Sequence, residues 1–122
     1  MPYNHPISTL KAEFFRVLGH PARVRILELL RDGERTVGDL QAELGLDSSG
    51  TSQHLGAFRK QGLLDSRRDG TSVYYRVRDP RVFQLLEIAR QVLSSNLAET
   101  RELLDGLAAT PPRRPRPPRS KT

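Results

Sequence analysis

Residues 36–77 have the sequence TVGDLQAELGLDSSGTSQHLGAFRKQGLLDSRRDGTSVYYRV, and the spacing of their apolar residues changes part of the way along. Up to about Gln61 apolar residues recur every three or four positions, the period of one helix face, and Gly45 divides this stretch into two helices. Thr36 is placed to cap the first helix. Three residues are placed to cap the second: Asp47, Ser48 and Ser49. Two helices joined across a short turn that contains glycine are typical of a helix-turn-helix.

Beyond Gly62 the period becomes two, which predicts β-strands. Two alternating runs, the second ending at Val77, lie on either side of Asp69-Gly70. Asp-Gly between alternating runs is the strongest short hairpin signal, because a type I′ turn needs positive φ at both central residues. We therefore predict a two-stranded ribbon directly after the second helix. One of its two tyrosines, Tyr74 or Tyr75, should lie in the core because they face opposite ways.

Three more helices are predicted, from Ser8 or Thr9 to Leu18, from Pro21 to about Arg31, and from Pro80 to about Leu107. The last helix would be ~42 Å long, and its apolar stripe is broader than one small domain covers. We expect it to pack, together with the first helix, against a second copy of the chain. The residues expected at this dimer interface are Leu10, Phe14, Leu86, Ala89, Leu93 and Leu97.

The predicted fold is therefore mainly α with a small β-hairpin: a winged helix-turn-helix that is dimeric through its first and last helices. We expect an N-terminal arm at 1–7, the winged helix-turn-helix domain with its dimerisation helices at 8–108, and a tail rich in Pro and Arg at 109–122. Two glycines inside the second helix of the helix-turn-helix, Gly50 and Gly56, each cost about 1 kcal/mol relative to Ala. They indicate either a close approach to the backbone or a weak helix.

Composition excludes several classes of protein. The chain has 122 residues, enough for one domain, and no Cys, so thiolate metal sites and thiol chemistry are excluded. No stretch reaches the roughly 18 apolar residues of a membrane span, and the N-terminus lacks the apolar core of a signal peptide, so we expect a cytoplasmic protein without a membrane partner. The net charge is +6, but Arg113, Arg114, Arg116, Arg119 and Lys121 supply five of the 20 bases. The rest of the chain is nearly neutral, with a local basic surplus over 46–78.

Four fragments in order carry a family resemblance: LGHPARVRIL (18–27), SQHL (52–55), GLL (62–64) and RRDGTSVYY (67–75). Over about residues 8–105 the chain resembles the ArsR/SmtB family of bacterial transcription regulators. The resemblance implies a homodimer on a near-palindromic DNA operator, with the helix at 48–61 in the major groove and the hairpin as the wing. A repressor is the family's usual mode, and an activator is the alternative.

The DNA contacts implied by this placement begin with Gln53, whose amide can pair with adenine through two hydrogen bonds. Ser and His side chains beside it reach bases or phosphates, and cations at the helix end and wing tip reach phosphates. The alternative for each is an ordinary solvated surface. The predicted contacts are Ser48, Ser49, Ser52, Gln53, His54, Arg59, Lys60, Arg67, Arg68 and Thr71.

An effector is less well defined. The family's metal-binding Cys pair, in the motif L-C-V-C-D-L, matches residues 35–40, where Thr36 and Gly38 stand at the Cys positions. The last helix lacks the His of another family site. A nickel, zinc or cobalt ion held by His5 and by acids such as Glu99 or Glu102 is therefore the form of metal sensing left open. His20 is expected to cap the helix that starts at Pro21 instead.

Catalysis is not predicted, because three scattered His, no Cys and no phosphate-binding glycine loop provide no nucleophile with a base and an orienting group. One other function class stays open. The wing and the Pro/Arg tail would suit a protein-interaction module that binds a second protein and retains DNA binding only as a vestige. A mobility shift with the promoter region of the protein's own gene separates the two.

Overall fold

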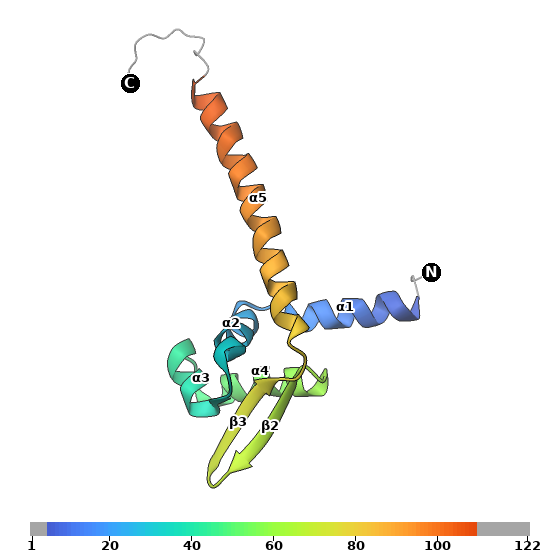
Figure 1. Cartoon of the computed structure of the whole chain (residues 1–122), viewed down its shortest axis with the longest axis vertical. Coiled ribbons are helices and arrows are strands. Elements are labelled where there is room, and N and C mark those ends of the chain that lie inside the picture. The colour runs from blue at the N-terminus through green and yellow to red at the C-terminus, as the bar shows by residue number, and fades with distance from the viewer. Residues whose placement is uncertain (1–4, 110–122) are drawn as a thin grey trace. The chain divides into compact units, whose positions relative to one another are not determined.

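The structure, a computed structural model, describes residues 5–109 and consists of helices with one small antiparallel sheet (Figure 1). The chain divides into two compact units between Phe83 and Gln84. In chain order the described elements are α1 (Pro6–Leu18), α2 (Pro21–Leu29), the 3₁₀ turn η1 (Leu30–Asp32), β1 (Arg35–Thr36), α3 (Val37–Leu44), α4 (Ser48–Lys60), β2 (Leu64–Asp69), β3 (Ser72–Val77) and α5 (Arg81–Ala109).

The helix-turn-helix of α3 and α4 lies at the positions that its capping residues in the sequence predicted. The Thr36 hydroxyl accepts the Asp39 backbone N–H at 3.1 Å, and the Asp39 carboxylate accepts the Thr36 N–H at 3.4 Å, which is a capping box. Gly45 ends α3 with φ 66°, a left-handed conformation that favours glycine. Asp47 is the cap of α4, and its Oδ1 accepts the Gly50 N–H at 2.7 Å. These bonds set where each helix begins and ends.

Each of α1 and α2 begins at a proline that follows a histidine. Nδ1 of His20 accepts the Ala22 N–H at 3.0 Å, so the predicted cap is confirmed. Nδ1 of His5 accepts the Ser8 N–H at 3.2 Å in the same way, and α1 starts at Pro6. The predicted start at Ser8 or Thr9 was therefore two or three residues late. The spacing of apolar residues gives no signal at Pro6, so it could not locate this start. The fixed φ and missing N–H of proline nevertheless suit a first helical position.

The β-hairpin is confirmed, with Leu64 opposite Val77 and Asp69 opposite Ser72. This register makes Gly70 and Thr71 the two loop residues, so the turn centre lies one residue later than Asp69-Gly70, and Gly70 has φ 65°. The sheet also contains a strand that the sequence did not predict. β1 pairs with β3, with Arg35 opposite Tyr75, and the strand order is β1-β3-β2. Two residues are too few to show an alternating period.

The core of the first unit lies where the helix-turn-helix, α2 and the base of the hairpin meet. Phe58, Leu55 and Thr51 of α4 are 0–2% exposed, as their inward spacing predicted, and the Thr51 hydroxyl donates to the Asp47 carbonyl at 2.9 Å. Tyr75 is the buried tyrosine of the pair. The other side chains buried to 3% or less are Ile26, Leu27, Leu30, Leu40 and Leu64. Three buried positions on one face fix the rotation of α4, and hence which residues face outward.

Apolar side chains remain exposed on α1 and on α5. Leu10 is 66% exposed in α1, and Leu93 and Leu97 are 60% and 69% exposed in α5. Ala89 is exposed as well, whereas Phe14 and Leu86 are half-buried. α5 ends at Ala109, two residues beyond the predicted end. Within residues 5–109, no helix is both long and apolar enough to cross a membrane.

Candidate nucleic-acid interface

The outward face of α4 gathers most of the predicted DNA contacts on one side of one helix. Because α4 is anchored through Thr51, Leu55 and Phe58, the residues three and four positions apart on its other side point to solvent. The exposed residues of α4 are Ser48, Ser49, Ser52, Gln53, Gly56, Arg59 and Lys60. In the described part of the chain no ion pair is recorded for Arg59 or Lys60, so both cations are available to an anionic partner.

His54 differs from its neighbours because it is half-buried against α2. Its Nδ1 accepts the Arg23 Nε–H at 3.0 Å, and its ring centroid lies 4.5 Å from that of His20. Burial lowers the pKa of His54, and the nearby His20 and Arg23 lower it further. With Nδ1 occupied, Nε2 is the ring atom of His54 that could reach DNA.

Arg23 is a residue that the sequence analysis missed. Besides the bond to His54, its Nη1 donates to the Val17 carbonyl at 3.3 Å, so one guanidinium joins the last turn of α1 to α4. Arg23 lies on a helix face with ordinary amphipathic spacing, and nothing local marks it. Only the packing of three helices gives it this role.

The two arginines near the wing tip, Arg67 and Arg68, differ in their partners. Arg67 lies 2.8 Å from a Glu34 carboxylate oxygen, and its guanidinium carbon is 4.5 Å from the Tyr74 ring centroid. The hydrogen bond from Arg67 lowers the pKa of Glu34 and raises that of Arg67. Arg68 has no recorded ion pair within residues 5–109, and Thr71 is exposed in the loop. Arg68 and Thr71 are thus the wing residues best placed for an outside partner.

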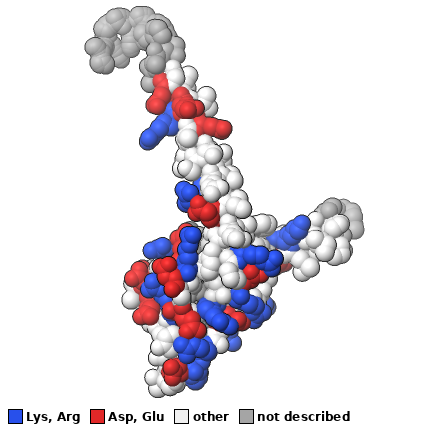
Figure 2. All heavy atoms as spheres, in the orientation of Figure 1, with Lys and Arg blue, Asp and Glu red and all other residues white. Residues whose placement is uncertain are grey.

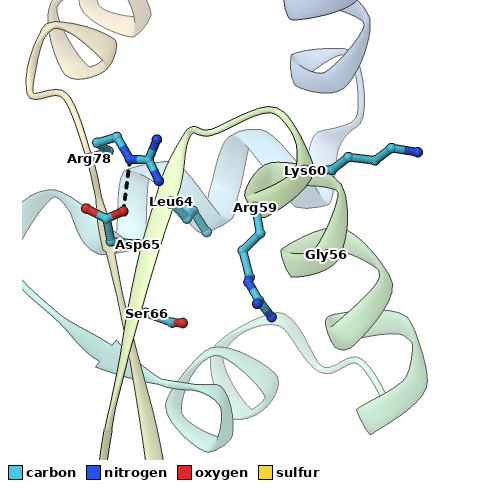
Figure 3. Close-up of a pocket in the computed structure, with 7 residues that line it drawn as sticks. All are labelled: Gly56, Arg59, Lys60, Leu64, Asp65, Ser66 and Arg78. Atoms are coloured by element: carbon cyan, nitrogen blue, oxygen red, sulfur yellow. Dashed lines mark hydrogen bonds and ion pairs between the residues drawn. The ribbon is translucent and has the colours of Figure 1, made fainter.

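A groove of about 540 Å³ lies between the second half of α4 and β2 (Figure 3). In this view Arg59 of α4 and Ser66 of β2 are directed toward the space between the two elements, whereas Lys60 points away from it. Nε of Arg78 donates to Asp65 Oδ1 at 2.9 Å, which neutralises the acid beside the groove. The residues that line it are Gly56, Arg59, Lys60, Leu64, Asp65, Ser66 and Arg78. Ser66 and Arg78 were not among the predicted contacts.

Charge does not form a single-sign patch on the face drawn in Figure 2, where basic and acidic side chains are intermixed over the compact unit. Arg76 and Arg78 both lie near Asp65, at 3.7 and 2.9 Å. Such exposed pairs contribute little to stability, but they remove cations from the set available to DNA. Of the described bases without a recorded ion pair, Arg59 and Lys60 lie on the outer side of α4 and Arg68 lies on the wing. The five bases of the tail lie outside the described residues.

The described residues do not provide the ligands for the metal site that we expected at His5. Nδ1 of His5 caps α1, and residues 5–109 contain no group of three or more His, Cys, Asp and Glu side chains that could hold a metal ion. The sequence analysis placed His5 in an N-terminal arm, whereas His5 is the cap at the start of α1.

The element order, the capped helix-turn-helix and the hairpin behind α4 define a winged helix-turn-helix, a class that binds DNA through its second helix. The comparisons with known proteins place the chain within this class. Residues 20–66 match the model of the bacterial regulatory protein, arsR family. Over 107 residues the chain is 45% identical to the uncharacterized HTH-type transcriptional regulator Rv0081 of Mycobacterium tuberculosis, covering 87% of this chain and 94% of that one. The chain belongs to the arsR family, and it is a DNA-binding transcriptional regulator and not an enzyme.

Three further comparisons agree. The crystal structure of Rv0081 superposes with a TM-score of 0.75 at 46% identity, over 80% of this chain and 98% of that one. The solution structure of Mb0332 from Mycobacterium bovis, described as a homodimeric winged helix-turn-helix DNA-binding domain, gives a TM-score of 0.68 at 29% identity, over 80% of this chain and 94% of that one. A probable mercury resistance operon repressor of Streptomyces lividans is 37% identical over 80% of this chain and 77% of its own length. The predicted family and fold class are confirmed.

Proposed function

We propose that the chain acts as a homodimer that binds a near-palindromic operator and represses transcription, with α4 in the major groove and the β2–β3 hairpin as the wing. The observation that carries this proposal is the outward face of α4. Its polar and cationic side chains have no partner that accounts for them in the described chain, while its inner face is locked in the core. A helix held in this way presents a fixed pattern of donors and acceptors to base edges.

Two parts of the proposal, dimerisation and repression, rest on other observations. The exposed leucines of α1 and α5 support dimerisation, and Mb0332 is described as homodimeric. Relatives named as repressors support repression over activation. We expect a protein of this function to act in the cytoplasm. The alternative of a protein-interaction module depends on the Pro/Arg tail as well as the wing, and the tail lies outside the described residues.

A mobility shift tests the function directly. The full chain is titrated against a duplex from the promoter region of its own gene and against an unrelated duplex of equal length. Preferential retardation of the promoter duplex, weakened in Gln53→Ala, supports the proposal. Equal binding of both duplexes by the wild type at physiological salt would instead leave a sequence-independent DNA binder, and no binding would favour the interaction module.

The effector stays a separate proposal, a nickel, zinc or cobalt ion at His5. A metal at His5 would have to draw its remaining ligands from a second copy or from residues outside 5–109, because the described chain offers no cluster. Calorimetric titration of the three metals into the wild type and His5→Ala, paired with operator binding, tests it. Binding that is unchanged in His5→Ala removes this residue from the mechanism.

A further inference from the structure

The two glycines inside α4 have different physical causes. A Cβ added at Gly50 would lie 2.9 Å from Asp47 Oδ1, the atom that accepts the Gly50 N–H and caps the helix. Gly50 is therefore explained by the close approach of the cap. Gly56 has no such neighbour, because a Cβ added there meets nothing within 4 Å. Its φ is not positive either, so the backbone does not require a glycine.

Gly56 thus weakens an exposed helix, and residues 5–109 show no packing benefit that explains it. It lies at the centre of the outward face of α4, one turn after Ser52 and Gln53 and one turn before Arg59 and Lys60. A glycine at such a place is explained when another molecule approaches the backbone closely. Gly56 is one of the residues that line the groove between α4 and β2.

The lining of the groove indicates the chemistry of that molecule. Arg59 and Ser66 offer a guanidinium and a hydroxyl to the space between α4 and β2 (Figure 3). Leu64, 2% exposed, also lines the groove. The Asp65 carboxylate is bound to Arg78, which leaves Arg59 as the unpaired charge directed at the space. A positive charge, a hydroxyl donor and a bare backbone suit a tetrahedral oxyanion such as a phosphate.

We propose that this groove receives a phosphate of the DNA backbone, held by Arg59 and Ser66, and that Gly56 is required because the phosphate lies against the α4 backbone. The inference rests on the proposed function, since it assigns a backbone contact to the same DNA. DNA is the favoured source of the phosphate because the groove continues the helix face that carries Gln53. A free phosphate ion is the other source.

Adding side-chain bulk at position 56 tests the proposal. Gly56→Ala and Gly56→Leu should raise the urea midpoint of unfolding, because both residues favour helix and nothing obstructs the Cβ. Both should lower DNA affinity on the order of tenfold, alike on promoter and unrelated duplex, since a phosphate contact carries no sequence information. The matched control is Gly106→Ala, at another exposed helical glycine where a Cβ meets nothing within 4 Å. It should leave DNA affinity unchanged.

The charge is tested by Arg59→Gln, which should reduce the slope of log affinity against log salt by about 1. Arg31→Gln, at an exposed arginine outside the groove, is the control and should not change the slope. Inorganic phosphate and chloride, compared at equal ionic strength, distinguish the two sources. Stronger inhibition by phosphate that is lost in Arg59→Gln supports DNA, because the free anion then competes with a DNA phosphate for this site. An unchanged salt slope in Arg59→Gln would overturn the assignment to DNA.

The result that would overturn the inference is a Gly56→Ala protein that is folded and binds both duplexes as tightly as the wild type. A urea midpoint below that of the wild type would also overturn it, because the free chain would then explain the glycine. These outcomes differ from failure of the proposed function, in which the wild type itself binds neither duplex.

Discussion

Gln53 and Arg68 offer different chemistry to DNA. Gln53 is exposed on α4, and its amide carries a donor and an acceptor in a fixed relation, which suits one base. Arg68 lies on the wing strand β2 as a cation without a recorded ion pair in residues 5–109, which suits any phosphate. Arg67 is held by Glu34 and Tyr74, so its neighbour carries most of the wing's available charge.

Substitution of these two residues should therefore change DNA binding in different ways. Gln53→Ala should cost about 1 to 3 kcal/mol of operator binding and relax the preference at one base position. Arg68→Ala should weaken binding to all sequences alike and reduce the salt slope by about 1. Titrations of each variant against operator and random duplex at several salt concentrations measure both effects. Similar patterns from the two variants would contradict the division of roles.

His54 gives the compact unit a pH dependence of defined sign. Its pKa in the folded chain lies below the ordinary 6.5, chiefly through burial. The unfolded chain therefore binds the proton first as the pH falls below about 6.5, and the free energy of unfolding decreases until the folded pKa is passed. His54→Gln should lose this part of the pH dependence in urea unfolding measured between pH 8 and pH 5. An unchanged pH profile would count against the buried environment of His54.

Among the elements, α5 is preceded by a carboxylate, Asp79, whose pKa is strongly lowered. Asp79 Oδ1 accepts the Arg81 backbone N–H at 3.0 Å, and the Arg81 side chain also donates to this carboxylate. These bonds lower the pKa of Asp79 from 3.8 to about 2, with the Arg81 side-chain hydrogen bond as the largest cause. The start of α5 is thus stabilised by an ionised Asp79.

Because the pKa is depressed, the stabilisation is present above about 3.8 and is lost as the pH falls through about 2. Asp79→Asn should show a smaller loss of stability between pH 4 and pH 2 than the wild type, and should be slightly less stable at pH 7. Helix content followed by circular dichroism during acid titration measures this. Parallel acid titration curves for the two proteins would show that Asp79 does not stabilise the helix start.

The helices and the hairpin were predicted from the sequence because period, caps and glycines agreed there. Thr36 is the N-cap of α3 and Gly45 is its C-cap, as expected. Thr51, Leu55 and Phe58 of α4 are buried, as their spacing predicted. Three features were missed for physical reasons. The start of α1 depends on a proline and a histidine cap, β1 is two residues long, and the turn centre depends on strand register.

The candidate DNA contacts were likewise predicted only in part. Which side of α4 faces outward follows from its period, so the exposure of Ser52, Gln53, Arg59 and Lys60 was predictable. Arg23, a partner of His54, lies 31 residues away in the chain, and Glu34, a partner of Arg67, lies 33 residues away. No local pattern encodes these contacts. The prediction that His54 and Arg67 contact DNA therefore did not take into account that Arg23 and Glu34 already engage them.

At the scale of the whole molecule, the exposed leucines of α5 need a partner surface, and a second copy is the proposed one. Replacing Leu93 and Leu97 together by Glu should give a folded monomer with much weaker DNA binding, since one half-site contact is lost. Both side chains are at least 60% exposed, so the exchange removes no core packing. Analytical ultracentrifugation and operator titration measure the two effects.

The control for this exchange is Gln91→Glu with Ser95→Glu, which adds the same charge at exposed polar positions of α5. This variant should remain dimeric. A double leucine variant that stays dimeric, or a monomer that binds the operator as tightly as the wild type, would contradict the proposed dimer.

The central claim, sequence-specific DNA binding by two copies of α4, is tested most directly by selection from a library of random duplexes. The account predicts that the wild type enriches one near-palindromic site with two half-sites and that Gln53→Ala, selected in parallel, loses preference at one symmetric pair of positions. Enrichment of no sequence by the folded wild type, or of a site without two-fold symmetry, would contradict it.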